Sequence, residues 1–147
     1  MSRKVFTLFS DDVRHEKGGK VSYMGVYTGR MLLASFPTTL TKFCVTLRIH
    51  TPTIKPFKKL IAIIYKDSEE IARGEMPIDE LEKAATKSDH TEKDTGKITT
   101  IHMGFVFSPF EVSGPCFLRV RIENEGAELK GIGLRILQAP EEENSGR

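Results

Sequence analysis

The densest group of ionisable side chains lies between two apolar runs near the N-terminus, Val5–Phe9 and Val21–Tyr27. This group places acidic and basic residues close together in the sequence. Its members are Asp11, Asp12, Arg14, His15, Glu16, Lys17 and Lys20. Opposite charges at this spacing tend to pair with one another, so we interpret them as a network of ion pairs and turn hydrogen bonds that fixes a hairpin. Gly18 and Gly19 provide the positive φ of its turn. These charged side chains are also the best candidate for a surface that binds a partner. That surface would consist of Asp11, Asp12, Arg14, Glu16 and Lys20.

Residues that could perform catalysis are few. A nucleophilic Ser, Thr or Cys needs a base and a group that orients the base. The imidazoles are His15, His50, His90 and His102, and none lies in a known catalytic motif. The G-x-S-x-G sequence of hydrolases is missing, and Lys17–Lys20 lacks the spacing of a phosphate-binding loop. The sequence therefore predicts a protein that is not an enzyme and that carries no cofactor.

Three short groups of carboxylates could meet in loops at one end of a sandwich, and hard cations such as Ca²⁺ prefer oxygen ligands. The groups are Asp11 with Asp12, Asp67 with Glu69, and Glu123 with Glu125. If the loops of a sandwich bring them together, the protein is a calcium- or carbohydrate-binding domain, and we keep this as an alternative. Their spacing matches no specific calcium loop, and a sugar site usually exposes tryptophan, which this chain lacks. Solvated turn residues are the favoured interpretation, so we predict no metal site.

The cysteines, the net charge and the hydropathy of the chain argue against several further functional classes of protein. Cys44 and Cys116 each lie inside an apolar run, as buried core thiols do, and no C-x-x-C pair indicates zinc or redox chemistry. A net charge of +2 argues against nucleic acid as a partner. The sequence contains neither a signal peptide nor an apolar run of about 20 residues that would span a membrane. These observations predict a cytoplasmic protein with reduced thiols and no membrane association.

The elements that must position these side chains are mostly strands. Apolar residues alternate with polar ones in Phe43–Ile49, Ile101–Phe107 and Cys116–Ile122, which is the period of a half-buried strand. Leu60–Tyr65 is apolar throughout and predicts a strand covered on both faces. In Leu129–Leu137 we expect one buried face, made of Ile132, Leu134 and Ile136.

One helix is predicted, over Pro77–Lys87, with Ile78, Leu81 and Ala85 on its apolar face. Residues 86–97 predict a polar surface loop, and Gly126 is expected to take positive φ in a turn. The pattern predicts an all-β fold, a two-sheet antiparallel β-sandwich of about seven to nine strands with one short helix. We assign residues 1–140 to a single domain and residues 141–147 to a flexible acidic tail.

The first third of the chain carries a recognisable pattern, D-D-x-R-x-E, then G-K-x-S, then G-x-Y, then F-P. Its residues are Asp11, Asp12, Arg14, Glu16, Gly19, Lys20, Ser22, Gly25, Tyr27, Phe36 and Pro37. With this pattern the chain resembles a family of small, uncharacterised bacterial and prophage proteins. The resemblance implies a bacterial or phage origin and a compact domain, and it brings no known activity.

Together these observations predict a non-enzymatic binding or protein-interaction module whose protein partner is unidentified. A sandwich has exposed sheet edges that need protection by a partner strand or by subunit pairing, so a homodimer is also expected. A phage-encoded inhibitor of a host protein is a further alternative, and it predicts tight one-to-one capture of a single host protein.

Overall fold

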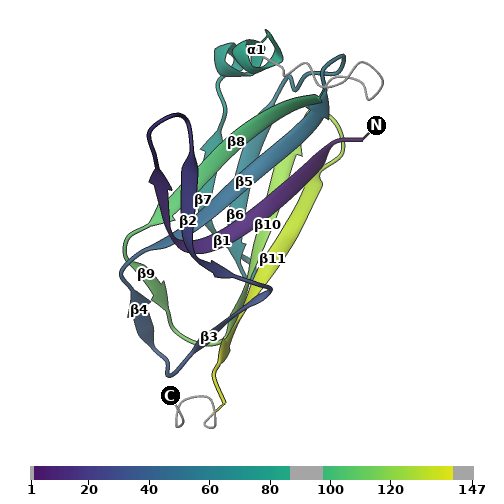
Figure 1. The fold of residues 1–147 in the computed structure, drawn as a ribbon. Coiled ribbons are helices and arrows are strands. Elements are labelled where there is room, and N and C mark those ends of the chain that lie inside the picture. The colour runs from purple at the N-terminus through teal and green to yellow at the C-terminus, as the bar shows by residue number, and fades with distance from the viewer. Residues whose placement is uncertain (1, 87–97, 141–147) are drawn as a thin grey trace.

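Two β-sheets packed face to face form the protein in a computed structural model that describes residues 2–86 and 98–140. Sheet A has the strand order β2-β1-β5-β8, and sheet B has the order β3-β11-β10-β6-β7 (Figure 1). Strands β4 and β9 make a separate pair. The elements are β1 (Lys4–His15), β2 (Val21–Tyr27), β3 (Arg30–Leu33), β4 (Thr38–Leu40), β5 (Phe43–Pro52), β6 (Leu60–Lys66), β7 (Glu69–Glu75), α1 (Ile78–Thr86), β8 (Ile98–Phe107), β9 (Phe110–Val112), β10 (Cys116–Asn124) and β11 (Leu129–Gln138).

The core lies between the sheets and follows the predicted alternation. In β5 the side chains of Phe43, Val45, Leu47 and Ile49 are fully buried, while Arg48 between them is exposed. Leu118, Val120 and Ile122 of β10 face them from sheet B, together with Leu134 and Ile136 of β11. Apolar side chains on the inner faces of both sheets are thus removed from water, which is the main force that holds the sandwich together. The predicted fold class is confirmed.

Several details differ from the prediction. The described residues contain eleven strands rather than seven to nine, because three- and four-residue strands carry too little sequence pattern to be seen. The β3–β11 pair is parallel, although the other pairs are antiparallel. Gly126 is not among the residues with positive φ, whereas Gly18 and Gly19 are, at 81° and 76°.

The helix is present as α1 but buries a narrower face than predicted. Leu81 is buried, whereas Ile78 at the first turn is 65% exposed. None of the helices in the described part of the chain is both long enough and apolar enough to cross a membrane. The predicted loop lies almost entirely outside the described residues, and so does the predicted acidic tail.

The largest difference concerns the charged N-terminal stretch. Strand β1 continues to His15, so Asp11, Asp12 and Arg14 belong to the strand and not to the turn. Strand β1 pairs with β5 only as far as Ser10, and beyond this point it pairs with β2 alone. Residues 11–25 therefore form a two-stranded hairpin arm that extends from sheet A (Figure 1).

Candidate functional site

Asp11 lies at the base of the hairpin arm and accepts a hydrogen bond from the hydroxyl of Tyr27. Its carboxylate lies where a side chain on Gly25 would stand, and Gly25 has a φ of 64°. Position 25 therefore requires glycine, because a side chain would meet the Asp11 carboxylate and because L-residues rarely adopt this φ. Burial and the neighbouring Asp11 raise the pKa of Tyr27 far above its usual value, so the phenol stays protonated and keeps donating.

Asp12 connects the arm to the rest of sheet A. Its carboxylate lies 2.6 Å from the ammonium of Lys42, which directly precedes β5, and 3.8 Å from the guanidinium of Arg14. The hydrogen bond from Lys42 and the backbone amide of Val13 lower the pKa of Asp12. The Asp11 hydrogen bond therefore joins the two strands of the hairpin, and the Asp12 ion pair connects the arm to the start of β5.

The turn of the arm contains the other two predicted site residues. Glu16 accepts a hydrogen bond from the Ser22 hydroxyl at 2.9 Å, and its amide donates to the Lys20 carbonyl at 2.7 Å. The five predicted residues are thus spread along the arm. Outside residues 11–25, Asp11 is contacted by Tyr27 and by the Cys44 thiol, while Asp12 is contacted by Ser10 and Lys42. These contacts support the structural interpretation of the charges, and their role in binding a partner remains a prediction.

We expect the double replacement of Asp11 and Asp12 by alanine to lower the melting temperature by several degrees. The Tyr27 hydroxyl and the Lys42 ammonium would each lose their carboxylate partner. Thermal unfolding followed by circular dichroism measures this, with Glu69→Ala at the exposed start of β7 as the matched control. An unchanged melting temperature would show that the two aspartates do not stabilise the arm.

The arm forms one wall of a groove of about 600 Å³ over sheet A. Two segments of the sheet, Cys44–Thr46 of β5 and His102–Val106 of β8, make the floor and the opposite wall. The side chains that the arm contributes are those of Val13, His15, Val21 and Tyr23. Val21 and Tyr23 are 40% exposed, and Val106 is 61% exposed. The groove thus offers apolar surface to a ligand.

Gly104 lies in the floor of this groove, opposite Thr46 in the β5–β8 register. Glycine inside a strand marks a bulge or a place where another group approaches closely. The β5–β8 register has no irregularity, and a Cβ atom built on Gly104 meets nothing nearer than the Val45 carbonyl oxygen at 3.9 Å. The fold itself does not require glycine here, so the space above it is open to a ligand.

A family model described as "Family of unknown function (DUF6941)" matches residues 5–137. The chain belongs to this family. The match extends from β1 to β11 and therefore includes the hairpin arm and the groove. It agrees with the expected resemblance to an uncharacterised family. None of the curated proteins matches the chain.

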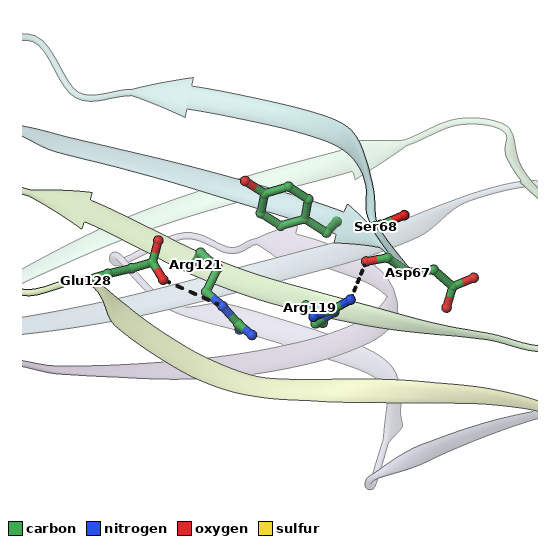
Figure 2. Close-up of a pocket in the computed structure, with 6 residues that line it drawn as sticks. Asp67, Ser68, Arg119, Arg121 and Glu128 are labelled. Carbon is green, nitrogen blue, oxygen red and sulfur yellow. Dashed lines mark hydrogen bonds and ion pairs between the residues drawn. The ribbon is translucent and has the colours of Figure 1, made fainter.

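A second depression in the DUF6941 protein lies on the outer face of sheet B (Figure 2). Arg119 donates from Nη2 to the Asp67 carbonyl at 2.9 Å, and Nε of Arg121 lies 3.8 Å from the Glu128 carboxylate. Two arginines and two acidic residues therefore line it, and their charges balance. Nε of Arg119 is buried without a hydrogen-bond partner in the described part of the chain, but it is closed to solvent and cannot reach a ligand.

The carboxylate groups that would have formed a calcium site lie far apart. The Asp67 side chain accepts from the amide of Phe117, at the start of β10, while Glu125 accepts from the amide of Lys58 beyond the other end of that strand. The aspartates of the arm belong to sheet A. No group of three or more potential metal ligands occurs within residues 2–86 and 98–140.

Sequence reasoning found the arm but not the groove. The groove depends on how the arm folds relative to β8, and no local pattern encodes that angle. Gly104 was the available signal, because it interrupts an otherwise bulky, alternating strand.

Proposed function

We propose that this DUF6941 protein is a non-enzymatic protein-interaction module that binds an extended, apolar segment of a partner polypeptide beside β8. The observation that carries the proposal is the open space above Gly104, in the floor of an apolar groove. In strand addition, main-chain hydrogen bonds provide affinity, and pockets for alternate side chains provide specificity.

The edge strands of the two main sheets support β8 as the binding element. Strand β3 has four residues, β2 is distorted at Gly25, and β7 carries the charged sequence EEIARGE with a register irregularity. Short length, distortion and charge are the usual protections of a sheet edge. By contrast, β8 has ten residues, ITTIHMGFVF, with no proline, no Asp, Glu, Lys or Arg, and a regular register. An edge of this kind is suited to pairing with another strand.

The groove also defines the chemistry of the partner segment. Its walls call for apolar side chains at alternate positions of an extended chain. Gly19 at the tip of the arm also lines the groove, and no carboxylate among the described residues lies within ion-pair distance of the nearby Lys17 or Lys20. Acidic residues next to the apolar run would complement these charges.

Selection of random 12-residue peptides on the immobilised protein tests the proposal. We expect enriched peptides to show apolar residues with a period of two and acidic residues at one end. Gly104→Val should abolish their binding in a fluorescence anisotropy titration, because the new side chain fills the groove floor. It should leave the melting temperature unchanged or slightly raised, since valine suits a strand better than glycine.

Two lysine substitutions make a matched control pair. Val106→Lys puts a charge in the groove and should weaken binding about tenfold or more, whereas Ile132→Lys alters an even more exposed apolar residue of β11 and should have no effect. The proposal is wrong if no peptide is enriched or if Gly104→Val binds as well as the wild type. It is also wrong if the protein is a dimer that Gly104→Val dissociates, because a second copy then occupies the groove.

A further inference from the structure

Beyond the groove, four basic or imidazole side chains gather on the outer face of sheet A. We call Lys4, Arg48, His50 and His102 the basic cluster. In the strand register Lys4 pairs with His50, and Arg48 pairs with His102 on its other side. Three strands, β1, β5 and β8, thus bring together residues that are up to 98 positions apart.

Phe6 supports the centre of the basic cluster. The guanidinium carbon of Arg48 lies 4.8 Å from the centre of the Phe6 ring, and the ring of His50 meets it edge-on at 5.1 Å. An arginine stacked on an aromatic ring keeps its N–H donors free at the rim of its planar group. The donors of Arg48 are therefore held in place while they remain open to solvent.

The positive charge of the basic cluster is not compensated. Over residues 2–86 and 98–140, no carboxylate lies within ion-pair distance of any of its four members. Elsewhere in the protein Arg3, Arg73 and Arg121 each have an acidic partner. Burial, followed by the charges of Arg48, His102 and Lys4, lowers the pKa of His50.

We infer that the basic cluster is a binding site for an oxyanion, that is, for a phosphate or carboxylate group. A guanidinium can bind either group with two parallel hydrogen bonds, and the neighbouring ammonium and imidazoles add donors on both sides. A bound anion supplies the negative charge that the surrounding side chains lack. The site shares only His102 with the peptide groove, so each proposal can fail while the other stands.

Histidine-selective NMR on the full chain tests this inference, with inorganic phosphate and acetate as two separate titrants at constant ionic strength. We expect saturable shifts of the His50 and His102 resonances and a rise in the pKa of His50, because an anion favours the protonated imidazole. Tighter binding of phosphate would identify a phosphate site, and equal or tighter binding of acetate would identify a carboxylate site.

Arg48→Gln should weaken binding about tenfold or more, which is the cost of losing a charge-assisted hydrogen-bond pair. The matched control is Arg135→Gln, since Arg135 is likewise exposed and stacked on a phenylalanine, Phe117 on sheet B, at 5.6 Å. It should leave the His50 shifts intact. The oxyanion site would be overturned if the histidine chemical shifts did not saturate with either anion. It would also be overturned if both variants reduced these shifts equally.

Discussion

Replacement of Arg3 by methionine is expected to lower the free energy of unfolding by about 3 kcal/mol, because several buried groups lose their partner at once. The Arg3 side chain is 8% exposed and lies 2.5 Å from the Glu125 carboxylate. Its guanidinium also donates to Thr51 Oγ1, Asn124 Oδ1 and the carbonyls of Lys55 and Pro56, and it stacks on the ring of Phe57. Arg3 thereby connects the start of β1 to the end of β10 and to the segment between β5 and β6.

Chemical denaturation of the variant measures this loss, and the melting temperature should fall by about 10 °C. Arg14→Met is the matched control, since Arg14 is exposed and its carboxylate contact is long at 3.8 Å. If Arg3→Met lowered the free energy of unfolding no more than Arg14→Met does, the buried contacts of Arg3 would contribute little to stability.

The same ion pair predicts how stability depends on pH. Burial disfavours ionisation of Glu125, but hydrogen bonds from the Lys58 amide, its own amide and Arg3 outweigh it and lower the pKa to about 2. A carboxyl whose pKa is lowered by folding stabilises the protein above its unfolded pKa, and that contribution is lost as pH falls through the folded value. Stability should therefore decrease between pH 4.5 and 2, and Glu125→Gln should make the decrease shallower.

The core was predictable because each long strand carries its own pattern. In β5, β8 and β10 the apolar residues alternate, and a strand has no other way to bury them together. The sandwich follows, since two half-apolar sheets must cover one another. The pairing order and the parallel β3 strand were not predictable, because they depend on contacts between segments distant in sequence.

The hairpin arm shows where local reasoning fails. Aspartate disfavours strands, so Asp11 and Asp12 predicted a turn. In the folded protein Tyr27 and Lys42 satisfy both carboxylates, and the strand continues through them. The five predicted site residues lie on the arm, but none of them lines the groove that the arm creates.

Ile132 gives the clearest failure of the alternating pattern. It was predicted to be buried with Leu134, yet it is 79% exposed. Leu118 pairs with Leu134 and Val120 pairs with Gly131, so two residues of β11 stand opposite one residue of β10. Such a bulge turns one side chain to the other face. The Thr7 hydroxyl of sheet A donates to the Ile132 carbonyl at 2.6 Å and connects the bulge to the opposite sheet.

Gly133, the second residue of this bulge, is expected to tolerate no side chain. A Cβ atom there would overlap the Leu118 carbonyl oxygen and lie 2.8 Å from the Phe117 ring, and backbone cannot move away as a flexible side chain can. Gly133→Ala should therefore cost about 3 kcal/mol and lower the melting temperature by about 10 °C. Gly104→Ala is the matched control, because its Cβ meets nothing nearer than 3.9 Å, and it should be neutral or stabilising. Packing fixes the glycine at position 133 but leaves the one at position 104 free, so the two substitutions should change stability differently. Equal changes in the free energy of unfolding would contradict both the bulge geometry and the open groove floor.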